Sequence, residues 1–335
     1  MKELNNKKIL FFAPDFFGYD IEIKKKLENF GAKVDLYNER PSSDFFTKAI
    51  IRLNKNLISR YIENYFDKII KQNQHKDFDY IFIIKGEAFN PIILKKLINC
   101  YSKAKIILYL WDSIRNYKEI KQCFPLLNKI LTFDHNDSDE YDSLIFRPLF
   151  FIEDYTTFNG PVIINSNYKY DLLFIGTIHS DRWLFLEKIK EEAIRNNLSI
   201  YYYPYIQSPI IFLFRKIFDK RLRTLALKEV KFKPISKSKI IELTRKSKAI
   251  LDIQHPEQTG LTMRTLEVFG SKRKLITTNE SIKTYDLYSP DNILVVDRKN
   301  PCIQSSFWET NYSPLPLELY GKYSINGWLQ DIFRE

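Results

Sequence analysis

The residues whose types and spacing could do chemistry lie between Gln254 and Asn279. Arg264 and Glu267 are three residues apart, so a helix would place this cation and this carboxylate on one side. We expect the helix to open at Thr259-Gly260-Leu261, where unpaired backbone N–H groups and the positive helix end suit a phosphate. Glu267 could then accept hydrogen bonds from a ribose diol while Arg264 offsets phosphate charge. The pattern predicts half of a nucleotide-sugar site.

The alternative for the same segment is an ordinary amphipathic helix. In that case Leu261, Leu266 and Phe269 pack into a core. Arg264 and Glu267 would then form a solvated surface pair without a ligand. Spacing alone leaves both interpretations open.

Strands and helices alternate along the whole chain, in two series. The first series has apolar runs at 9–14, 34–37, 80–84, 105–110, 129–133 and 144–146, and the second at 170–176, 200–203, 249–253, 275–278 and 293–296. Runs that are continuously apolar are typical of strands buried on both faces of a parallel sheet. The fold class predicted is therefore doubly wound α/β, with two Rossmann-like halves that face a cleft.

Two motifs in the second series resemble a known family. Gly260-Leu261-x-x-Arg264-x-x-Glu267 followed by Lys274-Leu275-Ile276-Thr277 resembles the donor-binding half of GT-B glycosyltransferases of group 1, especially the CgeB-like branch. The segment from Phe174 to Arg182, with Gly176, resembles the opening strand and loop of that half. The resemblance implies that Glu267 holds the nucleotide ribose and that Arg264, Gly260 and Gly176 lie near the diphosphate. The donor residues that we expect in addition are Arg182, Glu257 and Thr259.

The resemblance also implies a function and a domain plan. The enzyme would move a sugar from a nucleotide-diphosphate donor to a glycan or lipid-linked glycan in bacterial surface polysaccharide synthesis, such as capsule or lipopolysaccharide. No obligatory metal and no cofactor besides the donor substrate are implied. We expect an acceptor-side domain over 1–152, a linker over 153–168, a donor domain over 169–312, and over 313–335 a C-terminal helix that packs back on the first domain.

A catalytic base is expected in the first half, just after a strand. Ligands bind beyond the carboxyl ends of parallel strands, and an inverting sugar transfer needs a carboxylate that takes the acceptor proton. Asp112 is the preferred candidate and Asp134 the second. The alternative for each acid there is helix capping, as for Asp112 before Ser113. In many retaining enzymes of this fold two glutamates are separated by seven residues, but Thr259 stands where the partner of Glu267 would be, so the stereochemistry stays open.

Composition indicates a folded chain of two domains and favours a reducing compartment. The 335 residues suffice for two domains, and 44% hydrophobic residues exclude a disordered chain. Cys100, Cys123 and Cys302 are far apart and form no disulfide framework, which favours the cytoplasm. No apolar run approaches the ~20 residues that cross a bilayer.

The charge is positive, with 52 Lys and Arg against 41 Asp and Glu, a net +11. Two stretches, 45–71 and 210–223, interleave cations with apolar residues at helical spacing. Basic amphipathic helices of this kind can lie on an anionic membrane, so we expect a peripheral position on the inner face of the plasma membrane. The alternative is a core-facing helix with a solvated basic edge.

Other functions are disfavoured by what the sequence lacks. It contains no GxGxxG after its first strand, no phosphate-binding GxxxxGK[ST] loop, and no His/Cys cluster with zinc spacing. An epimerase or hydrolase acting on nucleotide sugars remains an alternative, because it can share the two-domain architecture. A basic nucleic-acid-binding protein is a second alternative, although no RNA-binding or helix-turn-helix motif occurs and no nucleic-acid partner is expected.

Overall fold

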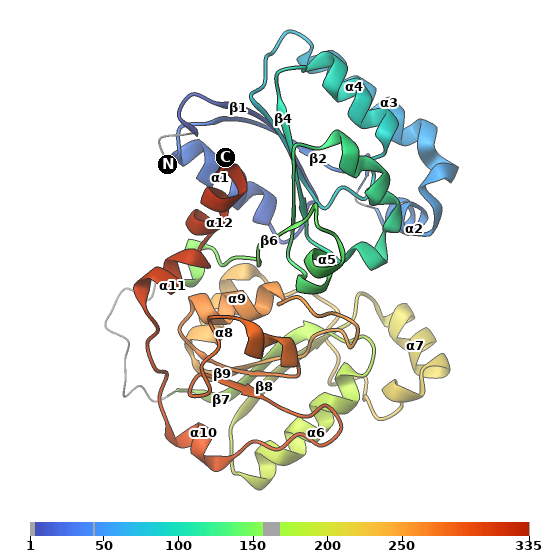
Figure 1. Cartoon of the computed structure of the whole chain (residues 1–335). Coiled ribbons are helices and arrows are strands. Elements are labelled where there is room, and N and C mark those ends of the chain that lie inside the picture. The colour runs from blue at the N-terminus through green and yellow to red at the C-terminus, as the bar shows by residue number, and fades with distance from the viewer. Residues whose placement is uncertain (1–3, 43, 157–167, 335) are drawn as a thin grey trace. The chain divides into compact units, whose positions relative to one another are not determined.

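The chain divides into two units in the computed structural model, which describes residues 4–42, 44–156 and 168–334 (Figure 1). Unit 1 comprises Met1–Leu149 together with Ile325–Glu335, and unit 2 comprises Phe150–Ser324. Each unit contains one parallel sheet with helices packed on it, so the predicted α/β fold class with two Rossmann-like halves is confirmed. Most of the linker predicted at 153–168 lies outside the described residues.

Unit 1 is built on a six-stranded sheet in the order β2-β1-β3-β4-β5-β6. Its strands are β1 (Lys8–Ala13), β2 (Lys33–Asn38), β3 (Tyr80–Ile84), β4 (Lys105–Leu110), β5 (Lys129–Thr132) and β6 (Ile145–Phe146). Its helices are α1 (Tyr19–Asn29), α2 (Phe45–Asn54), α3 (Ser59–Asn73), α4 (Pro91–Cys100), α5 (His135–Glu140) and α12 (Ile325–Phe333). Every residue of β3 is buried, as its continuous apolar run predicts for a central strand.

The last helix of the chain belongs to the core of unit 1. Trp328 of α12 is fully buried and meets the ring of Tyr109 edge-on, with centroids 4.8 Å apart. Phe333 packs in the same way on Phe82 of β3, at 5.3 Å. These contacts close one side of the sheet.

Unit 2 is built on a five-stranded sheet in the order β11-β10-β9-β7-β8. Its strands are β7 (Tyr170–Thr177), β8 (Ile200–Tyr205), β9 (Ser247–Asp252), β10 (Lys274–Thr277) and β11 (Ile293–Val295). Its helices are α6 (Arg182–Arg195), α7 (Pro209–Phe218), α8 (Lys237–Arg245), α9 (Met263–Gly270), α10 (Ser305–Glu309) and α11 (Leu317–Lys322).

Both sheets have one point at which the strand order reverses. In unit 1 the chain runs from β1 out to β2 and returns on the other side of β1 to form β3. In unit 2 the same happens with β7, β8 and β9. The crevice outside the carboxyl ends of the two strands that flank such a reversal is where ligands bind in doubly wound sheets. The topology therefore directs attention to the ends of β1 and β3, and of β7 and β9.

Two predicted helices are interrupted. The basic stretch at 45–71 forms α2, a 3₁₀ turn at Lys55–Ile58 and α3, because the extended backbone of Asn54 (φ −162°) breaks the first helix. The C-terminal segment, predicted as one helix over 313–335, forms α11 and α12 instead. Between them the carbonyl of Tyr323 accepts a hydrogen bond from the backbone N–H of Phe151 at 2.9 Å, which diverts the chain.

Among the described helices, none combines the length and apolar character required to span a bilayer.

Candidate active site

Arginine side chains from three separate elements gather at the carboxyl edge of β7 and β9 in unit 2. Arg182 begins α6, Arg264 lies in the first turn of α9, and Arg298 follows β11. The electrostatic influence of Arg298 and Arg264 on Arg182 shows that the three lie near one another. They mark a region of positive potential at the reversal point, where an anionic ligand is expected.

Arg182 has the most unusual environment of these cations. Its Nη1 donates to the carbonyl of Thr177, the last residue of β7, at 3.0 Å. Burial lowers the pKa of its guanidinium, and the carboxylate of Asp252 opposes that change. Among the described residues none accepts a hydrogen bond from its buried Nε. A buried guanidinium N–H without an acceptor is costly, so this atom is suited to an oxygen of a bound anion.

Gly176 leaves space beside this guanidinium. A Cβ built at Gly176 would lie 3.1 Å from the ring of Phe174 and 3.7 Å from Nη1 of Arg182. A side chain here would therefore crowd Phe174 and come into van der Waals contact with Arg182. The structure thus brings together Gly176 and Arg182, two of the residues that the sequence assigns to the donor.

Arg298 was not predicted from the sequence. Its Nε lies 3.2 Å from Oδ2 of Asp181, and its Nη2 donates to the carbonyl of Gln254 at 2.6 Å. These contacts join the loop after β7 to the loop after β9. The available signal was its position directly after the apolar run 293–296, because residues after strands line this edge of the sheet.

Helix α9 begins later than the sequence predicts. α9 starts at Met263, and its N-cap is Thr262, whose Oγ1 accepts from the backbone N–H of Thr265 at 3.1 Å. Oδ2 of Asp252, at the end of β9, accepts from both threonine hydroxyls, at 2.5 and 2.7 Å. The expected opening at 259–261 is therefore wrong, because this long-range carboxylate fixes the cap at Thr262.

Thr259, Gly260 and Glu257 lie in the loop before the helix. The carbonyls of Thr259 and Gly260 accept from the side-chain amide of Asn279, at 3.3 and 3.5 Å. The backbone N–H of Glu257 lies 3.3 Å from Nδ1 of His255, and its side chain is exposed. The loop is thus fixed to the segment after β10 by its backbone.

Arg264 and Glu267 form an ion pair with 2.8 Å between Nη1 and Oε2. Glu267 is only 8% exposed, so the pair differs from the solvated surface pair of the alternative interpretation. The phenol of Tyr155 also hydrogen bonds to Glu267; burial, and after it this carboxylate, raise the pKa of Tyr155. A ribose diol would have to replace or join these two partners. Tyr155 is a site neighbour that the sequence did not suggest.

His179 and His255 follow β7 and β9 and bring their rings together, with centroids 5.6 Å apart. Burial, followed by the charges of Arg182, His255, Arg215 and Arg298, lowers the pKa of His179 to about 4. The ring is thus neutral at neutral pH and surrounded by cations. It reports on the electrostatic potential of the cluster.

A bound diphosphate should raise the pKa of His179. The anion would offset the arginine charges that disfavour the imidazolium, so protonation should occur at higher pH than in the free protein. Two-dimensional NMR titration of the imidazole signals, with and without a nucleoside diphosphate, measures the change. The exposed His75 of unit 1 serves as the control. An unchanged His179 pKa at saturating nucleotide would place the anion elsewhere.

Asp112 lies beyond the end of β4 in unit 1 and remains partly accessible. Its Oδ2 is 3.2 Å from Nζ of Lys85, and Oδ1 accepts from the side-chain amide of Asn116 at 3.2 Å. The side chain is 39% exposed. It is not the cap that the alternative expected, because Asp137 receives the backbone N–H of Ile114 at 2.9 Å.

Asp134 has the capping role instead. It precedes α5, its Oδ1 accepts from the backbone N–H of Asn136 at 3.1 Å, and the residue is 2% exposed. A carboxylate enclosed in this way has little access to an acceptor hydroxyl. The geometry therefore favours Asp112 of the two.

Lys85 connects Asp112 to a buried ionic network after β3. Lys85 and Gly86 have φ values of 74° and 77°, a tight turn that returns the lysine Nζ to within 3.0 Å of Oε1 of Glu87. Glu87 also accepts from Nη1 of Arg40 at 2.9 Å. Burial raises the pKa of the neighbouring Glu39 to about 7. This network lies at the reversal point of unit 1 and holds Lys85 in place.

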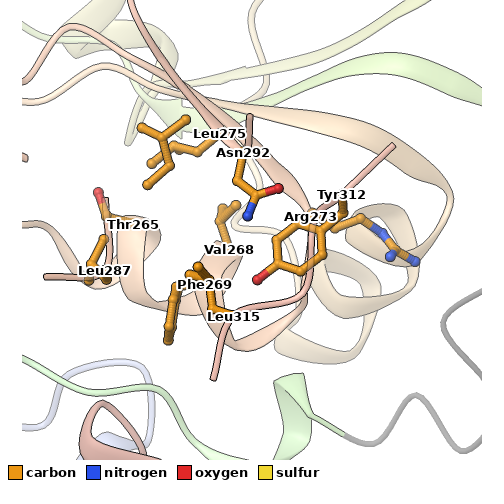
Figure 2. Close-up of a pocket in the computed structure, with 10 residues that line it drawn as sticks. Thr265, Val268, Phe269, Arg273, Leu275, Leu287, Asn292, Tyr312 and Leu315 are labelled. Atoms are coloured by element: carbon orange, nitrogen blue, oxygen red, sulfur yellow. The ribbon is translucent and has the colours of Figure 1, made fainter. Parts of the chain in front are cut away.

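A small cavity adjoins another face of α9 and is separate from the arginine cluster. Figure 2 shows it lined by Thr265, Val268, Phe269, Arg273, Leu275, Leu287, Asn292, Ile293, Tyr312 and Leu315. Its volume is about 10 Å³, room for one water molecule. It is therefore a packing void, not a nucleotide site.

In the described part of the chain, no group of three or more His, Cys, Asp or Glu side chains could hold a metal ion.

Solved structures share this fold over nearly the whole chain. A glycosyltransferase from Rickettsia africae aligns with a TM-score of 0.57 and 14% identity, over 99% of this chain and 100% of its own. HepE from Anabaena in complex with UDP-glucose gives 0.59 and 10%, over 97% and 98%. The lipopolysaccharide outer core galactosyltransferase WaaB gives 0.52 and 12%, over 98% and 96%. No protein-family model and no curated protein matches the chain.

These likenesses define the fold as that of the GT-B glycosyltransferases. They do not concern the CgeB-like branch in particular, so that finer relationship stays a prediction. At sequence identities of 10–14%, these likenesses show a shared fold but do not show that the reactions are shared. Function must be inferred from the site.

Proposed function

We propose that the protein is a glycosyltransferase that uses a nucleotide-diphosphate sugar as donor. The observation that carries the proposal is the arginine cluster at the reversal point of unit 2, above all the buried Nε of Arg182 without an acceptor. Arg182, Arg298 and Arg264 would bind the diphosphate, and Glu267 the ribose. UDP is the first nucleotide to test, because HepE of the same fold binds UDP-glucose.

The acceptor that we propose is a glycan or lipid-linked glycan of the bacterial surface. The likeness to a lipopolysaccharide galactosyltransferase supports this choice, and so does the net charge of +11, which suits an anionic inner membrane face. In unit 1, Asp112 would take the proton from the acceptor hydroxyl. We propose a cytoplasmic enzyme that works peripherally at the membrane.

An epimerase or hydrolase on the same fold is the competing function. Incubation with the nucleotide sugar alone separates the two. An epimerase or hydrolase converts its donor fully without acceptor, whereas a transferase leaves most of it intact. Full conversion without acceptor would therefore contradict the transferase proposal.

Glu267→Ala should weaken binding of the nucleoside diphosphate about 10- to 150-fold, the equivalent of one charged hydrogen bond. Isothermal titration calorimetry gives the affinity. The conservative Glu267→Gln keeps the shape of the side chain, and Glu309→Ala, at the exposed end of α10, is a matched control. If both Glu267 variants bind as the wild type does, Glu267 is not part of the site.

A further inference from the structure

α7 is a helix with an unusually apolar outer side. Ser208 caps it, with Oγ accepting from the backbone N–H of Ile211 at 3.2 Å, and Pro209 occupies its first turn. Five large apolar side chains are 57% to 79% exposed, and we call them the α7 surface: Ile210, Leu213, Phe214, Ile217 and Phe218. Their spacing of three and four residues places them along one side of the helix. Figure 1 shows α7 at the periphery of its unit.

The opposite side of α7 is fixed to unit 2. Phe212 is 1% exposed and belongs to the core. Arg215 donates through Nη1 to the carbonyl of Ile178 at 2.6 Å, and Lys216 donates to the carbonyl of Leu225 at 2.7 Å. The α7 surface is therefore the outward side of a helix whose opposite side is held firmly to unit 2. Soluble monomers rarely present so many adjacent apolar side chains unless they bind something.

Cations follow α7 in the chain, and the 3₁₀ turn Lys220–Leu222 that contains the first of them packs against the helix. Lys220, Arg223 and Lys228 are exposed. Arg221 is also exposed, but it is paired with Asp219 at 2.8 Å. An amphipathic helix with bulky apolar residues on one side and cations at its border matches the boundary between anionic headgroups and acyl chains. A second copy of the chain would instead bring the same cations together, because a symmetric contact pairs each patch with itself.

We propose that the α7 surface docks on an anionic lipid bilayer, with Phe214, Ile217 and their neighbours below the headgroups. The role of this contact in sugar transfer rests on the proposed function, but lipid binding itself does not. Arg215 connects the α7 surface to the candidate donor site. It reaches from α7 to Ile178, just beyond β7, and its charge acts on His179 in the arginine cluster. The bilayer would thus adjoin the element that borders the donor site.

The other basic stretch is a weaker candidate. Phe46, Leu53 and Leu57 are at least 75% exposed, but Arg52 and Lys55 among them contact groups of unit 1. Nε of Arg52 lies 3.3 Å from Glu87, and Nζ of Lys55 donates to the carbonyl of Phe89 at 2.7 Å. Arg52 and Lys55 are therefore engaged in unit 1 and are less available to lipid phosphates.

Flotation of the full-length protein with liposomes tests the proposal. Vesicles of phosphatidylglycerol with phosphatidylethanolamine should carry the protein upward at low salt, and vesicles of phosphatidylcholine should carry much less. Phe214→Ser with Ile217→Ser should reduce binding at least about tenfold, because two large apolar side chains no longer enter the bilayer. Lys220→Gln, Arg223→Gln and Lys228→Gln together should reduce it roughly 100-fold and remove its salt dependence.

Ile194→Ser provides the matched control, because Ile194 is a 75% exposed apolar residue on α6, outside the α7 surface. Its binding should equal that of the wild type. The proposal is overturned if the wild type stays with the soluble fraction in every vesicle and salt condition. It is also overturned if the variant with both Ser substitutions floats like the wild type. A third contrary outcome is that the wild type does not bind lipid but sediments as a dimer, and that the two Ser substitutions abolish this dimer.

Calorimetry with UDP on the same variants separates this proposal from the proposed function. Loss of flotation with intact UDP binding is the expected result for the α7 variants. Wild-type flotation without binding of any nucleoside diphosphate would leave lipid docking standing and contradict the donor site instead.

Discussion

Replacing Asp112 with Asn is expected to slow sugar transfer by a factor of about 100 to 10,000 while leaving donor affinity unchanged. The amide cannot accept the proton that the acceptor hydroxyl loses in the transition state. The structure supports this assignment because Asp112 lies beyond the end of β4 and its side chain is 39% exposed. Initial rates and calorimetry with the nucleotide sugar measure the two quantities separately.

Asp134→Asn is the matched comparison for this prediction. The Asn side chain keeps an oxygen that can cap α5, so turnover should remain close to that of the wild type. If Asp134→Asn loses activity while Asp112→Asn retains it, the two assignments are reversed. If neither variant loses activity, the base is another residue.

Replacing Arg182 with Gln is expected to weaken binding of a nucleoside diphosphate by at least roughly 100-fold. A charged hydrogen bond contributes about 1.5 to 3 kcal/mol, and the carboxylates of Asp252 and Asp181 nearby would be left with less compensating charge. The affinity for the nucleoside without phosphates should change little. Calorimetry with the two ligands provides the comparison.

Arg195→Gln, in the last turn of the same helix, is the control, because Arg195 is 69% exposed and lies at the opposite end of α6 from Arg182. Melting temperatures of both variants show whether the fold is retained. Equal losses of affinity for nucleoside and diphosphate in Arg182→Gln would indicate a disturbed fold, since Arg182 also bonds to Thr177. Arg298→Gln then tests the same cluster from another element.

The central strands could be predicted from the sequence almost residue by residue. The apolar runs 80–84 and 105–110 coincide with β3 and β4. Such runs are informative because a strand buried on both faces needs apolar residues at every position. Breaks in helices were not predictable in the same way. The interruption between α11 and α12 depends on a hydrogen bond from Phe151, a residue about 170 positions earlier in the chain, which local periodicity cannot register.

The residues that lie together in the candidate site could be predicted only in part, because most of them come from different elements. Arg264 and Glu267 belong to one helix, so their spacing was visible in the sequence. Arg298, Arg215 and Tyr155 come from separate elements, and only the fold brings them to the same region. The start of α9 was misplaced because Asp252, on a strand, determines which threonine caps the helix.

The basic stretches show what charge patterns leave open. Periodicity identifies a helix that carries cations and apolar residues, but it does not say which cations reach solvent. Lys55 is 9% exposed and donates to the carbonyl of Phe89, although its position in the sequence suggests a surface cation. The long aliphatic part of such a side chain allows the charge to reach a backbone acceptor in the interior.

The most direct test of the donor site is calorimetric titration of the wild-type protein with UDP and the other nucleoside diphosphates. We predict that at least one of them binds with one molecule per chain, and that its affinity falls by at least roughly 100-fold in Arg182→Gln but not in Arg195→Gln. Failure of every nucleoside diphosphate to bind, or equal affinities for the wild type and Arg182→Gln, would contradict a nucleotide-sugar site at the ends of β7 and β9.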